Sequence, residues 1–401
     1  MANGLRFAAL QNRDFRLFWF GQLVSLCGTW MQSVAQGWLV YSLTKSPFYL
    51  GLVAASSTLP ILLFTLAGGI VADRFRKRNL LLVTQVLSIV PALALGILTD
   101  MRVVTVWQVA FFAAVLGTIN AFDVPARQSF IVEMVGKAHL TNAIALNSAA
   151  FHGARMIGPV IAGLAIATVG LPACFYVNAL SFGAVIISLT KIHARGEIHQ
   201  SSNGVVTDLL DGLRYIKGQS TILRVIILIA IFSLLGMPFI TLLPVFAAEI
   251  YQKGPEGFGV MVGATGAGAL LAALFLAWRD DIVEKTKFMA ISALCFSLLL
   301  LVFSFTRLFP IGIGILVCIG WSLVSFFAVA NSFIQLTVPD NLRGRAMSVY
   351  AFVFLGTAPI GNSIIGAAAN AAGTAFTVGV IAVVCLITSM VFCIKICKSG
   401  S

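Results

Sequence analysis

The hydrophobic residues of this chain fall into twelve long runs that short polar connections separate. A helix that spans a membrane needs about 20 mostly apolar residues, and each run reaches about that length. The runs cover residues 15–43, 48–72, 79–99, 103–124, 141–168, 172–192, 221–248, 258–278, 287–306, 310–336, 344–369 and 374–395. The pattern predicts an all-α membrane protein with twelve transmembrane helices, and the even number places both chain ends on one side of the membrane.

A 36-residue pattern that includes one of these runs occurs twice, with an offset of 203 residues. The copies are 128–163 and 331–366, and they are identical at 11 of 36 aligned positions. Chance similarity between two apolar helices is the alternative, but the copies also share the polar loop that precedes the helix. A duplication predicts two pseudo-symmetric six-helix bundles, an arrangement typical of transporters that rock one half against the other.

The predicted domain boundaries follow from the longest polar stretch of the chain, residues 193–219. We expect an N-terminal bundle at 1–192, a cytoplasmic linker at 193–220 and a C-terminal bundle at 221–401. Within the linker, four apolar residues recur at helical spacing on one face: Leu209, Leu210, Leu213 and Ile216. This spacing predicts a short amphipathic helix that lies along the membrane surface.

Composition and charge agree with a membrane protein. Hydrophobic residues make up 59% of the chain and charged residues 10%, whereas a soluble domain carries about 25% charged residues. The net charge of +12 comes from basic residues that gather on the side of the two chain ends. The positive-inside rule identifies that side as the cytoplasm, so the basic excess is a topology signal and implies no nucleic-acid partner.

The sequence lacks three common enzyme signatures. It has no GxxxxGK[ST] phosphate loop, no HExxH motif and no nucleophile elbow. The four histidines are scattered, and the seven cysteines show no metal-ligand spacing with them. We therefore expect neither an enzyme nor a resident metal or cofactor.

The connection between the second and third runs carries the segment GIVADRFRKR, residues 69–78. This segment resembles the GxxxDRxGRR signature of the major facilitator superfamily, with Arg76 in place of the second glycine. The resemblance implies a cytoplasmic gate, in which the aspartate contacts a helix of the other half in one conformation. The gate residues expected here are Gly69, Asp73, Arg74 and Arg78. The alternative is a plain positive-inside anchor.

The fifth run contains Gly158, Pro159 and Gly163 in a segment that resembles the GPxxGG element of helix five in drug-exporting members, with Ala162 in place of one glycine. Glycines allow helices to approach closely, and proline weakens the helical hydrogen-bond ladder. We expect this helix to move at the interface between the halves. The eighth run offers a matching face of Gly259, Gly263, Gly266 and Gly268.

His152 and Arg155 lie on one side of the same predicted helix. Arg155 is the one basic residue well inside a predicted span, where a charge must face a cavity or a partner. One interpretation is a structural ion pair, for which Asp123 at the predicted end of the fourth run is the nearest candidate. The other is a gating or anion-binding contact. His152 is equally consistent with a hydrogen-bonded structural residue.

A polar stripe follows the first run at steps of three and four residues, and it ends with Gln32, Ser33 and Gln36. Since helices one, four, seven and ten line the cavity in the superfamily that the chain resembles, polar residues on these runs are the candidates for substrate contact. They are Gln32, Gln36, Asn120, Asp123, Thr241, Asn331 and Gln335. Packing between helices is the alternative for each of them.

The whole chain resembles the major facilitator superfamily, and residues 12–47 resemble the branch with the enterobactin exporter and related secretion-type permeases. This resemblance implies a monomer in the inner membrane of a bacterium that exports a small amphipathic molecule, siderophore-like or drug-like, by alternating access. It also implies contact with membrane lipid and a proton gradient as the driving force. Proton antiport rests on the resemblance alone, because residues 103–122 lack the usual helix-four arginine. A lipid or lysolipid flippase and a non-transporting sensor are the alternatives.

Overall fold

The computed structural model describes residues 8–194, 213–279, 282 and 284–397, and within them every regular element is helical. The principal helices are α1 (Arg13–Thr44), α2 (Pro47–Arg74), α3 (Lys77–Asp100), α4 (Val106–Thr168), α5 (Leu171–Lys191), α7 (Ser220–Ile231), α8 (Leu243–Val245), α9 (Gly254–Trp278), α10 (Lys285–Phe305), α11 (Phe309–Thr337), α12 (Asp340–Gly356), α13 (Ala358–Ala372) and α14 (Thr374–Cys397). Short irregular helical segments are η1 (Ala8–Gln11), η2 (Phe232–Gly236), η3 (Met237–Leu242) and η4 (Phe246–Ile250).

These elements form twelve membrane-length helices. Helix α4 contains two of them, because Gly136 has a φ of 68° and a ψ of 174° and breaks the helix there. Eleven helices of the described chain are long and apolar enough to cross a membrane, and α1, with 32 residues, is the twelfth. The polar stripe of α1 lowers its hydropathy below that of the others. The predicted all-α fold is confirmed, but the fourth span continues to Gly136 and does not end at 124.

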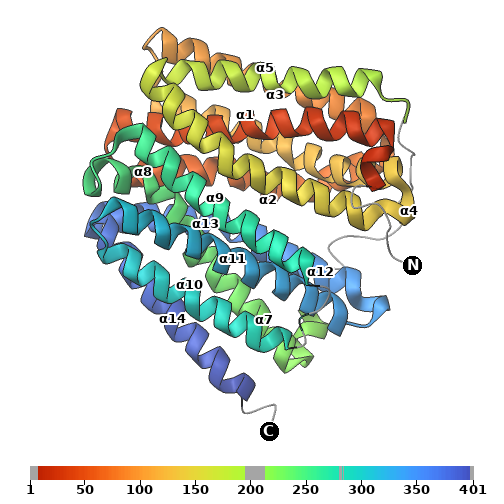
Figure 1. Ribbon diagram of the computed structural model, residues 1–401, viewed down its shortest axis with the longest axis vertical. Coiled ribbons are helices and arrows are strands. Elements are labelled where there is room, and N and C mark those ends of the chain that lie inside the picture. The colour runs from red at the N-terminus through yellow and green to blue at the C-terminus, as the bar shows by residue number, and fades with distance from the viewer. Residues whose placement is uncertain (1–7, 195–212, 280–281, 283, 398–401) are drawn as a thin grey trace.

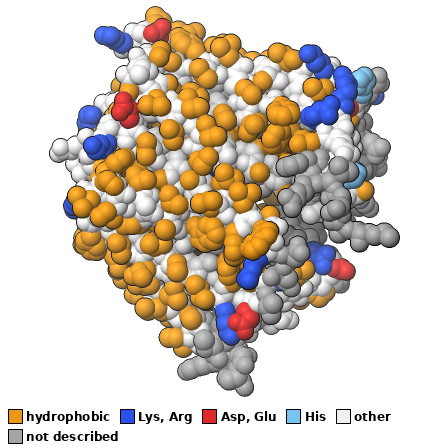
Figure 2. Space-filling view, viewed as in Figure 1, with side chains coloured by type: hydrophobic (Ala, Val, Ile, Leu, Met, Phe, Trp, Pro, Cys, Tyr) orange, Lys and Arg blue, Asp and Glu red, His pale blue; other side chains and the backbone are white. Residues whose placement is uncertain are grey.

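The helices form two groups that lie at an angle to each other (Figure 1). Helices α1 to α5 form the first group, and α7 to α14 form the second. We call the end at which α5 ends and α7 begins the linker end, and the opposite end the far end. The groups meet at the far end and diverge toward the linker end. Apolar side chains cover most of the face in Figure 2, and charged ones gather near the two ends.

The repeated glycines occupy equivalent positions in the two groups. A Cβ on Gly158 would lie 2.8 Å from the Cys27 carbonyl oxygen in α1, and one on Gly361 would lie 2.1 Å from that of Leu234 in η2. Each of these glycines therefore packs against the first span of its own group. The repeated partners Gly163 and Gly366 instead pack against the second span of the opposite group, at Pro255 of α9 and Gly51 of α2 respectively.

The ends of several helices follow from local sequence. The Asn12 side chain accepts hydrogen bonds from the backbone N–H groups of Asp14 and Phe15 and so caps α1. Thr105 and Gln108 form a capping box at the start of α4. Pro238 and Pro244 lie between the π-helical turns η2 and η4. Because proline donates no backbone hydrogen bond, the span 220–250 is irregular at its centre.

The linker lies mostly outside the described residues. Leu209 and Leu210 belong to that part, while residues 213–218 are helical, and Ile216 is buried. The domain boundaries 1–192, 193–220 and 221–401 stay a prediction.

Candidate transport site

A polar cavity of about 520 Å³ lies inside the first group of helices. All five helices of that group contribute to it. Its polar lining consists of Gln22, Ser25, Thr29, Gln32, Ser33, Gln36, Ser57, Thr58, Gln85, Ser88, Asn120, Arg127, Gln128, Asn147 and Asn178. The stripe that the sequence places on one face of α1 thus lines a cavity. We call this space the polar cavity.

Amide side chains of the polar cavity are partly paired with each other. The Asn178 Nδ2 atom donates to Gln32 Oε1 at 2.7 Å, and both side chains are almost fully buried. The Oε1 atoms of Gln22 and Gln85 are buried and accept no hydrogen bond within the described chain. Because buried polar groups are normally satisfied, these two oxygens are free to accept from a ligand, water or proton carrier.

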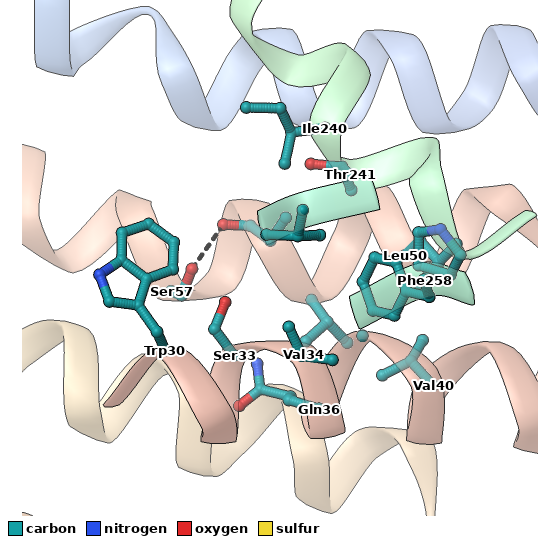
Figure 3. Close-up of a pocket in the computed structure, with 15 residues that line it drawn as sticks. Trp30, Ser33, Val34, Gln36, Val40, Leu50, Ser57, Ile240, Thr241 and Phe258 are labelled. Carbon is teal, nitrogen blue, oxygen red and sulfur yellow. Dashed lines mark hydrogen bonds between the residues drawn. The ribbon is translucent and has the colours of Figure 1, made fainter. Parts of the chain in front are cut away.

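A smaller pocket of about 160 Å³ lies between the two groups (Figure 3). Trp30, Ser33 and Gln36 project from α1 toward Ile240 and Thr241 of η3. Most of its other lining residues are apolar: Val34, Val40, Leu50, Val53, Ala54, Pro244, Phe258 and Val262. Ser33, Gln36 and Ser57 line both this pocket and the polar cavity, so the two spaces adjoin.

The structure places four of the predicted cavity residues on these two spaces. Gln32, Gln36 and Asn120 line the polar cavity. Thr241 lines the small pocket, and its hydroxyl donates to Asn362 Oδ1 at 2.9 Å.

The other three predicted cavity residues line neither space. Near the linker end of α11, Gln335 Nε2 donates to Asn331 Oδ1 at 2.6 Å. Asp123 is 1% exposed and lies behind the wall of the polar cavity. The stepwise spacing of polar residues therefore predicted the lining on α1 better than it predicted the lining on α11.

Asp123 is surrounded by hydrogen-bond donors. Thr84 Oγ1 donates to Asp123 Oδ1 at 2.7 Å, and Gln85 Nε2 donates to the same oxygen at 2.9 Å. Arg127, one turn further along α4, forms an ion pair with Asp123 Oδ2. Because the fourth span runs on to Gly136, this cluster lies within the span and not at its end.

Arg155 has no carboxylate partner within the described chain. Its guanidinium carbon lies 5.5 Å from the centre of the Trp30 ring, a cation–π contact. The side chain is 8% exposed, and its Nε atom has no hydrogen-bond partner. Since Asp123 is paired with Arg127, the interpretation of Arg155 as its ion-pair partner is wrong. His152 lies nearby, and its buried Nδ1 is also unpartnered.

The glycines of α9 bring that helix onto the fifth span. A Cβ on Gly259 would lie 2.4 Å from the Pro159 carbonyl oxygen, and one on Gly266 would lie 2.6 Å from that of Arg155. Gly263 faces Met156 in the same way. Gly268 differs from the expectation, because it packs against Val317 of α11. The two backbones therefore touch along several turns at the boundary between the groups.

The predicted gate residues lie at the linker end of the first group. Asp73 is half-buried and makes no hydrogen bond or ion pair within the described chain; Arg74 is exposed. A Cβ on Gly69 would have no neighbour within 4 Å. Arg78 is bound within its own group, because its Nε donates to the Leu189 carbonyl oxygen at 2.7 Å and so caps α5.

The far end is closed by contacts between the groups. The Tyr41 hydroxyl donates to Glu249 Oε1 at 2.9 Å. Ser46 Oγ donates to Asn370 Oδ1 at 2.8 Å. A Cβ on Gly366 would lie 2.9 Å from the Gly51 Cα atom, so α2 and α13 are in backbone contact. The described arrangement is closed at the far end and divergent at the linker end.

Sequence reasoning missed much of the cavity wall. Gln85 and Ser88 on α3, Ser57 on α2 and Asn178 on α5 all line the polar cavity. The signal was present on α3, where Thr84, Gln85 and Ser88 follow helical spacing in an otherwise apolar run. On α2 and α5 the polar residues are too few to distinguish a cavity from helix packing.

Twelve membrane helices in two groups, with a polar cavity in the first group that adjoins a pocket between the groups, have the architecture of a transporter of the major facilitator fold. The chain belongs to the transmembrane secretion effector family, whose sequence profile matches residues 5–399. It is 23% identical to the staphyloferrin A transporter of Staphylococcus aureus (strain NCTC 8325 / PS 47) over 94% of this chain and 95% of that protein.

A second relative agrees with this assignment, and a solved structure shares the fold. The chain is 27% identical to the multidrug efflux pump Tap of Mycolicibacterium fortuitum over 89% of each chain. The fold is similar to the crystal structure of the nucleoside transporter NupG, with a TM-score of 0.73, 14% identity and coverage of 94% of this chain and 98% of the other. The protein is thus a multi-pass membrane transporter and not an enzyme.

Proposed function

We propose that this protein exports a small amphipathic molecule, siderophore-like or drug-like, by alternating access driven by protons. The observation that carries the proposal is the polar cavity, which adjoins a pocket between the two groups and is closed at the far end. A cavity near the middle of the membrane, at the interface between repeated halves, is where secondary transporters bind their substrates. The names of the relatives, a staphyloferrin A transporter and a multidrug efflux pump, support these two substrate classes.

The chemistry of the lining supports an amphipathic substrate. The first group supplies amides and hydroxyls, including Gln32, Gln36 and Asn120. The pocket between the groups adds the apolar surfaces of Trp30 and Phe258. A ligand with a polar end in the first group and an apolar end against the second group would satisfy both surfaces.

We infer that the linker end faces the cytoplasm of a bacterium and that the transporter lies in the inner membrane. Basic residues such as Arg74, Lys77 and Arg78 lie at that end, in accord with the positive-inside rule. On this assignment the conformation described is inward-facing, and both chain termini are cytoplasmic. An exporter takes up its substrate from the cytoplasm in this state.

The gate proposal assigns Asp73 a contact in the outward-facing state. Asp73 has no partner among the described residues where the linker end diverges, so a contact with the second group would form only on closure. A contact present in one state alone shifts the equilibrium between states. Gly69 and Arg74 belong to the same gate, whereas the bonds of Arg78 to α5 favour a structural role for that residue.

We further propose that Arg155 is a gating or anion contact at the boundary between the two groups, where α9 packs against the fifth span. Its guanidinium has no acidic partner within the described chain and lies against Trp30, which lines the pocket between the groups. Gly158 and Pro159 follow on the same helix, where α9 crosses it. When the two groups move relative to each other, the environment of a charge at this crossing changes, so the charge can favour one conformation over the other.

Transport by the purified protein in proteoliposomes tests the proposal. Ethidium and staphyloferrin A serve as probes, with and without a pH gradient across the vesicle membrane. Movement of either probe that depends on the gradient supports proton-driven efflux. Probe transport at the same rate with and without the gradient would contradict proton-driven transport. Movement of fluorescent lysolipid alone would favour a flippase.

A further inference from the structure

Asp123 is the one carboxylate of the described chain that is both fully buried and located in the middle of a span. It is 1% exposed and lies well inside the span Val106–Gly136. Ionisable residues inside the membrane are costly and commonly mark ion or proton pathways. The carboxylate therefore calls for an explanation beyond packing.

Three neighbours of Asp123 direct hydrogen-bond donors at its two oxygens in this conformation: Thr84, Gln85 and Arg127. Because a carboxylate accepts and an amide N–H donates, the contact with Asp123 orients the Gln85 amide. Its Oε1 atom is then left without a donor, in the lining of the polar cavity.

Thr84 can also accommodate the protonated form. Its hydroxyl lies 2.7 Å from Asp123 Oδ1 and 3.0 Å from the Leu81 carbonyl oxygen, but it has one hydrogen to donate. When Asp123 is ionised, that hydrogen points to the carboxylate. When Asp123 is protonated, it can donate to Thr84 Oγ1 while the hydroxyl turns to Leu81. Thr84 therefore keeps a hydrogen bond with Asp123 in both forms without a movement of the backbone.

Arg127 connects the carboxylate to the cavity. Its side chain is 20% exposed and lines the polar cavity, while its Nε atom has no hydrogen-bond partner among the described residues. Protonation of Asp123 would remove the charge that compensates this guanidinium. The cavity wall then carries one more positive charge than before.

The other charged groups on the helices packed against Asp123 are occupied elsewhere or make no contact with it. Lys77 pairs with Glu133 at 2.9 Å, and Arg78 caps α5. Other charged residues on α1 to α5 whose side chains the structure describes are Arg13, Asp14, Arg16, Asp73, Arg74, Asp100, Arg155 and Lys191, together with the titratable His139 and His152. Among the described residues, none of these ten forms a hydrogen bond or ion pair with Asp123.

We propose that Asp123 is the proton-binding residue of this transporter, with Arg127 as its partner and Thr84 as a positioning residue. The proposal rests on the proton-driven function above. In the outward-facing state, a proton from outside adds to the carboxylate, and the ion pair with Arg127 is lost. In the inward-facing state, the proton leaves to the cytoplasm and the ion pair forms again, as in the conformation described here. One proton enters for each cycle of this site.

Infrared difference spectroscopy on the full-length protein in lipid nanodiscs tests the site without a substrate. Spectra taken across a pH titration should show the C=O band of a buried carboxylic acid, and Asp123→Asn should abolish it. Asp100→Asn makes the same chemical change at an exposed carboxylate and should leave the band in place. Asp123→Glu should shift the band, which separates loss of the site from loss of the fold. A band that persists unchanged in Asp123→Asn would overturn the proposal.

Ethidium and staphyloferrin A transport in proteoliposomes then separates this proposal from the function on which it rests. We expect Asp123→Asn to reduce gradient-driven transport to background while exchange of probe across the membrane without a gradient continues. Gradient-driven transport that survives in Asp123→Asn overturns the assignment of the residue. If the wild-type protein shows the carboxylic acid band but no response to the gradient, the proton-driven function fails and the proton site stands.

Discussion

The Tyr41 hydroxyl donates a hydrogen bond to the Glu249 carboxylate across the boundary between the two groups of helices, at 2.9 Å. We expect Tyr41→Phe to weaken closure of the far end, because this bond joins residues that must separate when the far end opens. Loss of one hydrogen bond to a charged group at a partly exposed site costs about 1 kcal/mol. The population of the outward-open state should therefore rise about fivefold.

Pulsed electron paramagnetic resonance can measure that shift. Spin labels on Met101→Cys and Leu308→Cys report the separation of the groups at the far end, after the native cysteines have been replaced by serine or alanine. Tyr176→Phe is the matched control, since its hydroxyl bonds to Asp100 within one group at 3.5 Å. An equal shift in both variants would show that the Tyr41 bond has no special role in closure.

A larger residue at Gly366 should also open the far end. A Cβ there would lie 2.9 Å from both the Gly51 Cα atom and the Pro47 carbonyl oxygen, so Gly366→Val forces α13 away from α2. Overpacking of this kind costs roughly 1–3 kcal/mol, and here it destabilises the conformation that is closed at the far end. The same label distances should lengthen. Gly344→Val, at a position with nothing within 4 Å, should leave them unchanged, and a melting temperature equal to wild type would exclude general unfolding.

The fold was predictable because the lengths of the hydrophobic runs and the internal repeat can both be recognised in the sequence. The repeated positions Gly163 and Gly366 even make corresponding contacts between the groups. The site was predictable only where polar residues are dense, as on α1. Asn331 and Gln335 fit the same spacing rule but bond to each other at the linker end of α11, because spacing identifies a face and not what that face meets. The ion-pair partner of Asp123 was not predicted, because the fourth span was expected to end at residue 124. The helix instead continues through Pro125 and so includes Arg127.

Cysteine labelling should separate the cavity residues from the two that lie outside it. Gln36→Cys and Asn120→Cys are expected to react with a membrane-impermeant thiol reagent applied from the cytoplasmic side, and a transported probe should protect them. Gln335→Cys should react equally well but without protection, since Gln335 is exposed and lines neither cavity. Protection at Gln335, or no labelling at Gln36 and Asn120 in any state, would contradict the position of the site.

Asp73→Asn tests the gate at the linker end. The variant should fold and bind probe normally, because Asp73 has no partner among the described residues in the conformation that is closed at the far end. Turnover should fall about tenfold, which corresponds to about 1.4 kcal/mol in the rate-limiting step. Arg78→Gln should behave differently and lower the melting temperature, since it removes the bonds that cap α5. Normal turnover in Asp73→Asn at normal protein levels would reduce this segment to a topology anchor.

Substitution of Arg155 distinguishes a structural from a functional guanidinium. If Arg155 were half of a buried ion pair, Arg155→Met would leave a partner charge unsatisfied and cost about 3–5 kcal/mol. The described chain contains no such partner, and the contact with Trp30 can be replaced by an apolar one. We therefore expect Arg155→Met to change stability by no more than about 1 kcal/mol and to reduce efflux about tenfold or more, which corresponds to about 1.4 kcal/mol.

Arg155→Lys should recover little transport, because lysine lacks the planar fork that stacks on an aromatic ring and binds anions in two places. Arg279→Met is the control for loss of an arginine that lies over an aromatic ring, since Arg279 is exposed and 5.9 Å from the Phe275 ring centre. That variant should transport normally. Melting curves in detergent and probe efflux from proteoliposomes give the two measurements. Full transport by Arg155→Met would exclude a functional role. Unfolding of both Arg155 variants would assign the residue a structural role at the boundary between the two groups.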